Sequence, residues 1–228
     1  MSTLEQRYQT VSAHICSACE QMQRSTEDVK LLAVSKTKPA HMVETLYRLG
    51  QRAFGENYLQ DAVEKITSLA HLNDIEWHFI GPIQSNKTRT IAEHFQWVET
   101  LDRQKIAQRL NDQRPDHLPP LKVLIQVNIS REEQKSGIPP ELVEDFATLL
   151  DDLPRLSLLG IMCIPESTDD ESKLGKQFAE MQQLLQRLAN NHPQCTVLSM
   201  GMSSDLALAI QYGSSQVRIG TDIFGARN

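Results

Sequence analysis

Residues 31–50, LLAVSKTKPAHMVETLYRLG, hold the pattern that decides the fold. A short apolar run, residues 31–35, is followed by a segment in which Val43 and Leu46 recur at helical spacing and which Gly50 closes. A strand followed directly by a helix is the unit of a parallel sheet, because a parallel neighbour can be reached only by a crossover connection.

The same alternation continues along the chain and predicts a barrel. Strand-like runs occur at residues 31–35, 52–54, 76–80, 96–99, 122–128, 156–161, 196–200 and 216–219. About eight such units in one chain fit a closed (β/α)8 barrel of the TIM type better than an open doubly wound sheet. Leu4, Val11 and Ile15 stand at helical spacing and predict an extra N-terminal helix. We therefore expect a single α/β barrel domain over residues 1–228.

Composition narrows the class of protein. The 228 residues are 40% hydrophobic and 23% charged, which is typical of a globular chain. There are 23 basic and 29 acidic residues, a net charge of -6, and no basic run, so we expect no nucleic-acid partner. Residues 1–9 are polar, and no run of about 18 apolar residues occurs. We expect a cytoplasmic protein without membrane contact and, since no heptad or apolar stripe stands out, a monomer.

The cysteines and histidines lack the spacing of metal ligands. Cys16 and Cys19 form a C-x-x-C inside the predicted N-terminal helix, and Cys163 and Cys195 fall in apolar strand-like runs. We expect all four to be reduced structural thiols, the first pair half-buried. The histidines are scattered along the sequence. No metal is predicted.

Lys36 is the first candidate for chemistry. Strand periodicity puts Leu32, Val34 and Lys36 on one face, which we expect to be the barrel interior, with Lys36 ending the strand at the functional rim. Partial desolvation there favours the neutral amine, which can attack an aldehyde. On this segment alone, a lysine that reaches solvent is the simpler alternative.

Two segments near the end of the chain have the pattern of a phosphate site. SMGMSSD, residues 199–205, and VRIGTDIFGAR, residues 217–227, each run from a strand through glycine and hydroxyl residues into a helix. Loops after the last two strands of a barrel often bind phosphate. Glycine lets the backbone approach a ligand, and Ser or Thr at the helix start offers a hydroxyl. Ordinary helix capping is the alternative.

Arg218 stands two residues before Gly220, in phase to face the barrel interior. A buried guanidinium carries only donors and stays protonated, so it needs an acceptor. A carboxylate is the usual acceptor, and a ring nitrogen of a ligand is the alternative.

Six motifs together resemble the pyridoxal phosphate homeostasis protein family, which itself resembles the N-terminal barrel domain of alanine racemase. The resemblance spans nearly the whole chain in the expected order. The motifs are AVSKTKP at 33–39, FGENY at 54–58, WHFIGPIQSNK at 77–87, KSGI at 135–138, LSMGMSSD at 198–205 and VRIGTDIFGAR at 217–227.

The resemblance implies a cofactor, pyridoxal 5'-phosphate (PLP), and assigns roles around its ring. Lys36 would form the Schiff base, Arg218 would face the pyridine nitrogen, and Asn57 would lie near the phenolic oxygen. His78 ends the third strand and could line the pocket or be a core histidine with satisfied hydrogen bonds.

The resemblance also implies the phosphate contacts. Ser203, Gly220 and Thr221, together with Ser204, would hold the phosphate. Lys135 in the KSGI motif could be a second docking point for the aldehyde, although an exposed loop lysine is the simpler interpretation.

The family implies a carrier of the cofactor rather than an enzyme. It points to intracellular PLP homeostasis and supply of PLP to apo forms of PLP-dependent enzymes. Alanine racemase uses a second base from a further β-domain, and this sequence ends eight residues after Gly220, so we expect that base to be missing. Arg218 would also disfavour protonation of the ring nitrogen, which makes the ring a poorer electron sink. A weak PLP-dependent amino-acid racemase is the alternative.

Overall fold

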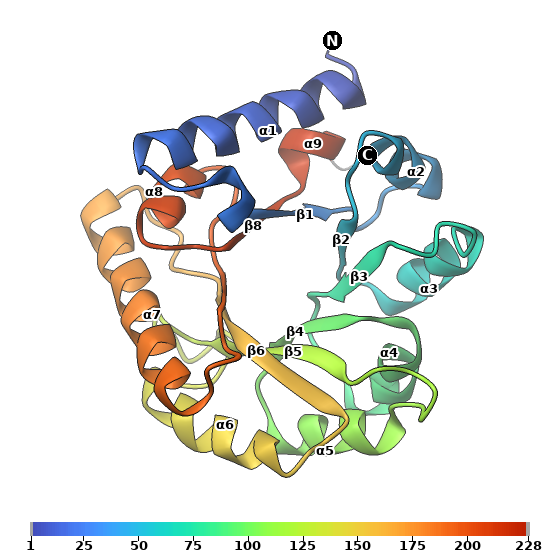
Figure 1. Cartoon of the computed structure of the whole chain (residues 1–228), viewed down its shortest axis with the longest axis vertical. Helices are drawn as coiled ribbons and strands as arrows, with labels where there is room; N and C mark the ends of the chain where they lie inside the picture. Colours follow the sequence, from blue (N-terminus) through green and yellow to red (C-terminus); the bar gives the residue numbers. More distant parts are fainter. Residues whose placement is uncertain (1, 227–228) are drawn as a thin grey trace.

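In the computed structural model, which describes residues 2–226, eight parallel strands close into a barrel surrounded by helices (Figure 1). Each strand pairs with its neighbours in sequence, and β8 pairs with β1. The predicted TIM-type barrel is confirmed. The strands are β1 (Lys30–Val34), β2 (Ala53–Glu56), β3 (Glu76–Phe79), β4 (Trp97–Leu101), β5 (Leu121–Val127), β6 (Leu156–Cys163), β7 (Val197–Ser199) and β8 (Gln216–Ile219).

Each predicted strand run overlaps an observed strand, although several boundaries differ by one or two residues, including the end of β1 at the site. β1 ends at Val34, so Lys36 lies two residues beyond the strand instead of ending it. The chain turns after the strand, and Thr37 in this turn adopts a left-handed backbone conformation, with φ at 62°. Lys36 therefore stands in the turn above the barrel.

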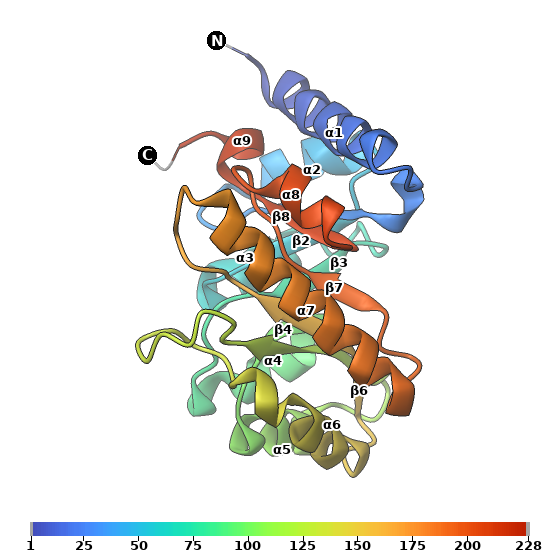
Figure 2. The ribbon, with the colours of Figure 1, turned by 90° about the vertical axis from the view of Figure 1, so that its left-hand side faces the viewer.

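The helices cover the outside of the barrel, as Figures 1 and 2 show from two sides. The predicted N-terminal helix is confirmed as α1, which packs against α8 and α9. Because α9 is short, α1 covers the side of the barrel next to β8 and β1. The helices are α1 (Leu4–Gln21), α2 (Ala40–Arg48), α3 (Leu59–Ser68), α4 (Thr88–His94), α5 (Gln104–Gln113), α6 (Val143–Asp151), α7 (Glu171–Asn191), α8 (Leu206–Gln211) and α9 (Thr221–Phe224).

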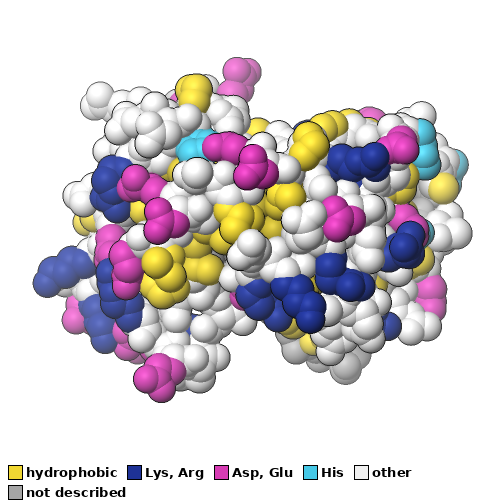
Figure 3. All heavy atoms as spheres, turned by 90° about the horizontal axis from the view of Figure 1, so that it is seen from below, with side chains coloured by type: hydrophobic (Ala, Val, Ile, Leu, Met, Phe, Trp, Pro, Cys, Tyr) yellow, Lys and Arg dark blue, Asp and Glu magenta, His cyan; other side chains and the backbone are white. Residues whose placement is uncertain are grey.

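Several smaller expectations can be compared with the described residues. Cys16 is exposed and Cys19 is buried, so the first pair is not uniformly half-buried, while Cys163 and Cys195 are buried; all four are free thiols. Among residues 2–226, no helix is long and apolar enough to cross a membrane. On the face drawn in Figure 3, basic and acidic side chains are interspersed, and apolar side chains gather near the middle.

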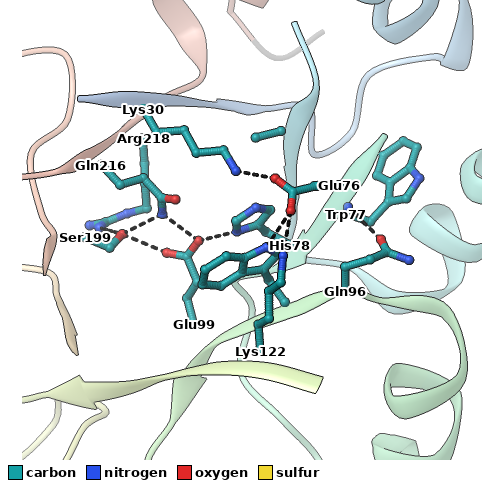
Figure 4. Close-up of polar contacts among 12 residues, drawn as sticks. Lys30, Glu76, Trp77, His78, Gln96, Glu99, Lys122, Ser199, Gln216 and Arg218 are labelled. Carbon is teal, nitrogen blue, oxygen red and sulfur yellow. Dashed lines mark hydrogen bonds and ion pairs between the residues drawn. The ribbon is translucent and has the colours of Figure 1, made fainter. Parts of the chain in front are cut away.

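The layer outside the barrel is apolar, whereas the interior is mixed. Phe54 and Ile125 are fully buried in the main hydrophobic cluster between strands and helices. Inside the barrel, Trp97, Leu124 and Met162 form a separate small apolar cluster. The interior also carries polar and charged side chains that point toward one another (Figure 4).

Glu76 organises the end of the barrel interior opposite the carboxyl ends of the strands. It forms ion pairs with Lys30 and with Lys122, the latter at 3.0 Å, and accepts a hydrogen bond from Trp97 Nε1 at 3.2 Å (Figure 4). Both lysines also lie over the Trp97 ring. Burial opposes ionisation of Glu76, but the bonds from Lys30, Lys122 and Trp97 outweigh it and lower its pKa from 4.5 to about 2.

This depressed pKa predicts an acid-dependent loss of stability. A carboxylate with a lowered folded pKa stabilises the fold above its unfolded value of 4.5, and that contribution is lost as the pH falls toward about 2. We expect Glu76→Gln to be less stable than the wild type near neutral pH and to approach it near pH 2. Urea unfolding midpoints across this range measure the difference. Glu44→Gln, which removes an exposed pair with Arg48, is the control and should leave the pH dependence unchanged. Parallel pH curves for Glu76→Gln and wild type would contradict the assignment.

Candidate functional site

A cavity of about 340 Å³ opens at the rim formed by the carboxyl ends of the strands. Its walls come from the loops after β1, β2, β3, β6, β7 and β8 together with strand residues below them. All seven predicted site residues line it: Lys36, Asn57, Ser203, Ser204, Arg218, Gly220 and Thr221. The described lining is completed by five apolar residues: Val34, Ile80, Met162, Ile164 and Met202.

Lys36 lies half-buried in a tight turn between β1 and α2. The backbone N–H of Ser35 donates to the Gly55 carbonyl and the N–H of Lys38 donates to the Ser35 carbonyl, both at 3.0 Å. Thr37 is β-branched and rarely stable in the left-handed region, so the surrounding contacts must hold this conformation. The turn therefore fixes where the Lys36 side chain begins.

A buried ion pair between Lys65 and Glu56 stabilises that turn. Lys65 Nζ, on α3, donates to the Ser35 carbonyl at 2.9 Å and to Glu56 Oε1 at 2.5 Å. Ser35 Oγ donates to the same carboxylate oxygen at 2.6 Å. Burial raises the pKa of Glu56, and the charge of Lys65 opposes that rise. The cluster links the start of the Lys36 turn to the end of β2, and Asn57 follows Glu56 directly.

Asn57 lines the cavity and has an unsatisfied polar side-chain atom. Its side-chain Oδ1 is buried and has no hydrogen-bond partner among residues 2–226. A buried polar atom without a partner is costly.

Three side chains with hydroxyl groups also line the cavity. The hydroxyls of Ser203, Ser204 and Thr221 form no hydrogen bond within the described chain, although all three line the cavity. They are not helix caps: the N-cap of α8 is Asp205 and that of α9 is Gly220, neither with a side-chain cap bond. The capping alternative for these residues is therefore wrong. Hydroxyls beside a glycine turn are the donors that a phosphate requires.

Arg218 forms the base of the cavity and is only 6% exposed. Its NH1 donates to Ser199 Oγ and its NH2 to the Cys163 carbonyl, both at 2.8 Å. Ser199 Oγ donates in turn to Glu99 Oε2 at 2.7 Å. The expected carboxylate is thus reached through a serine rather than directly, as Figure 4 shows.

Glu99 is the centre of a hydrogen-bonded group that the sequence analysis did not identify. It is completely buried and accepts from Gln216 Nε2 at 2.7 Å and from His78 Nδ1 at 2.6 Å. Burial lowers the pKa of His78 and keeps its ring neutral. Burial opposes ionisation of Glu99, but its hydrogen bonds and the nearby Arg218 charge lower its pKa. The sequence held one signal for this group: in the strand-like run WVETL, residues 97–101, the charged Glu99 lies on the same strand face as Trp97.

His78 does not line the cavity among the described residues and is a core histidine. Its ring stacks on Trp97 at 4.9 Å between centroids, and its Nε2 has no partner within residues 2–226. Ile80, two residues further along, reaches the cavity instead. His78 is therefore a core histidine, but with only one of its two ring nitrogens hydrogen-bonded within the described chain, so the expectation of satisfied hydrogen bonds is met in part.

A second cavity of about 440 Å³ adjoins the first and shares Ile164, Met202 and Ser204 with it. Lys135 lines this second cavity, not the first. Its Nζ pairs with Glu132 Oε1 at 2.6 Å and donates to the Pro165 carbonyl at 3.1 Å. The last residue of the VRIGTDIFGAR motif, Arg227, lies outside the described residues.

The barrel and its rim cavity define the class of protein. They place the chain among barrels of the alanine racemase N-terminal domain type, whose family model matches residues 12–228. The alanine racemase of Corynebacterium glutamicum has the same fold, with a TM-score of 0.68 at 18% identity over 94% of this chain and 61% of the racemase.

Closer relatives define the family. A pyridoxal phosphate homeostasis protein of Pasteurella multocida is 52% identical over 99% of this chain and 98% of its own length. PipY of Synechococcus elongatus PCC7942, solved with PLP bound, superposes with a TM-score of 0.80 at 32% identity, covering 92% of this chain and 100% of PipY. The chain belongs to the pyridoxal phosphate homeostasis protein family.

Proposed function

We propose that this protein binds PLP in the rim cavity, holds it as a Schiff base on Lys36 and supplies it to apo forms of PLP-dependent enzymes without turnover of its own. In this proposal residues 1–228 act as one PLP-binding domain, as a monomer in the cytoplasm. The observation that carries it is the convergence of seven predicted side chains on one cavity. A structure of the relative PipY with PLP bound supports the choice of ligand.

The cavity offers PLP a matching group at each end. PLP supplies an aldehyde that an amine attacks reversibly, and the resulting imine can be exchanged to another amine. Lys36 provides the amine from the turn after β1. Ser203, Ser204 and Thr221 provide hydroxyl donors for the phosphate, and Asn57, whose buried amide oxygen lacks a partner within the described chain, lines the same cavity.

Arg218 suits the pyridine nitrogen as an acceptor. Two of its N–H groups are used by Ser199 and Cys163, and a guanidinium has five. A permanent cation donates a hydrogen bond to a ring nitrogen but cannot accept its proton, so the ring stays unprotonated. An unprotonated ring withdraws electrons weakly, which favours storage over carbanion chemistry.

The lining also favours binding over catalysis. Among its described residues the ionisable side chains are Lys36 and Arg218, and the rest are apolar, amide, hydroxyl or glycine. Proton transfer at an α-carbon needs a positioned acid or base besides the lysine. A cavity with this lining holds an aldehyde in reserve more readily than it turns over an amino acid.

The phosphate contacts can be tested with two forms of the ligand. We expect Ser203→Ala and Thr221→Val each to raise the PLP dissociation constant about tenfold, the effect of one hydrogen bond to a charged group. Pyridoxal, which lacks the phosphate, should bind each variant as it binds the wild type. Absorbance titrations give both constants, with Ser167→Ala in the neighbouring cavity as control. Equal losses for both ligands would place the phosphate elsewhere.

Delivery can be tested by reactivating an apo-enzyme. Purified protein loaded with PLP should be yellow and restore activity to an apo form of a PLP-dependent enzyme in the presence of a trap for free PLP. Lys36→Ala should lose this transfer, whereas Lys105→Ala, an exposed lysine on α5, should keep it. Failure of the loaded wild type to reactivate any of several apo-enzymes would refute the supply role.

A weak amino-acid racemase is the second candidate, favoured by the match to the alanine racemase N-terminal domain. In deuterium oxide, the carrier proposal predicts no deuterium at the α-carbon across a panel of amino acids. Incorporation that disappears in Lys36→Ala would establish the enzyme instead.

A further inference from the structure

Arg218 is linked to the buried carboxylate of Glu99 through Ser199. The Ser199 hydroxyl is fully buried and has three partners: it accepts from Arg218 NH1 at 2.8 Å and from Gln216 Nε2 at 3.0 Å, and donates to Glu99 Oε2 at 2.7 Å. A hydroxyl has one hydrogen to donate and two lone pairs. Every position is therefore used, and the carboxylate dictates where the serine hydrogen points.

That orientation has a consequence for Arg218. Because Glu99 takes the serine hydrogen, the lone pairs of Ser199 are left to face Arg218 and Gln216 (Figure 4). The Cys163 carbonyl holds NH2 of Arg218 at 2.8 Å from another strand. The guanidinium is fixed at two nitrogens, in a plane set by the barrel and not by the ligand.

Glu99 itself does not line the cavity among the described residues, and it is completely buried one layer below. Gln216 and His78 complete its hydrogen bonds. The negative charge of Glu99 is therefore fixed beneath Arg218. It offsets the positive charge that Arg218 presents to a ligand in the cavity.

We propose that Glu99 is a positioning residue which, through Ser199, fixes the Arg218 guanidinium toward the pyridine nitrogen of the bound ligand. This inference rests on the proposed function, since it concerns how the PLP ring is recognised. Glu99 and Ser199 act on the ligand only through Arg218. Their removal changes recognition of the ring nitrogen and leaves the aldehyde and phosphate ends unaffected.

The test compares PLP with its benzene analogue, in which a C–H group replaces the ring nitrogen. Both ligands keep the aldehyde, the phenol and the phosphate. We expect the wild type to bind PLP about tenfold more tightly than the analogue, the factor of one hydrogen bond from a charged donor. Glu99→Gln and Ser199→Ala should lose most of this preference by weakening PLP alone.

The control is Glu76→Gln, which removes the other glutamate of the barrel interior but touches neither Ser199 nor Arg218. It should keep the wild-type preference. The double variant Glu99→Gln with Ser199→Ala should lose no more preference than either single variant, because both act along one path. Thermal unfolding of the ligand-free proteins checks that each variant is folded.

The outcomes separate the inference from the function it rests on. Equal weakening of both ligands in Glu99→Gln and Ser199→Ala would assign Glu99 a structural role only and overturn the inference. A wild type that binds both ligands equally would also overturn the inference. The same holds for variants that keep the wild-type preference for PLP. A wild type that binds neither ligand would refute the proposed function itself. Ser199→Ala alone decides the question if Glu99→Gln does not fold, because it leaves both charges in the barrel.

Discussion

The pairing of β1 with β8 is the constraint on which the site depends. Leu32 lies opposite Arg218 and Ala33 opposite Ile219 in this parallel ladder, which closes the barrel. Parallel strands bring their carboxyl ends to one rim, so the turn that carries Lys36 meets the Gly220 turn across this seam. Residues from the two ends of the sequence thus form one cavity. Without this ladder, Lys36 and Thr221 would have no reason to be neighbours in one cavity.

Charge inside the barrel is the second feature that bears on function. Buried ionic groups cost desolvation, and apolar residues would fill a barrel more stably. Two charged groups occur in the described interior: Glu76 with two lysines far from the rim, whose side chains are 30–42% exposed, and the fully buried Glu99 beneath Arg218. The ion pairs of the first group, around Glu76, explain its presence by their contribution to the stability of the fold. The second lies next to the cavity, which Arg218 lines, and under the proposal it positions that cation for a ligand that carries an acceptor.

Local sequence patterns were enough to predict the barrel and the location of the site, because strand and helix periods are properties of neighbouring residues. The family motifs identified the seven candidate site residues, whose side chains line one cavity. Contacts between distant strands were not predictable: nothing local links Glu99 to Ser199, or Lys65 to the Ser35 carbonyl. The exact end of β1 also escaped prediction, since Thr37 takes a conformation that its residue type disfavours.

The central claim is that one amine, Lys36, holds the cofactor. Borohydride reduction of the PLP-loaded protein makes the attachment permanent, and peptide mass mapping then locates it. The account predicts a single phosphopyridoxyl adduct on the peptide that contains Lys36, and none there in Lys36→Ala. A protein that stays colourless with PLP, or an adduct on another lysine in the wild type, would contradict it.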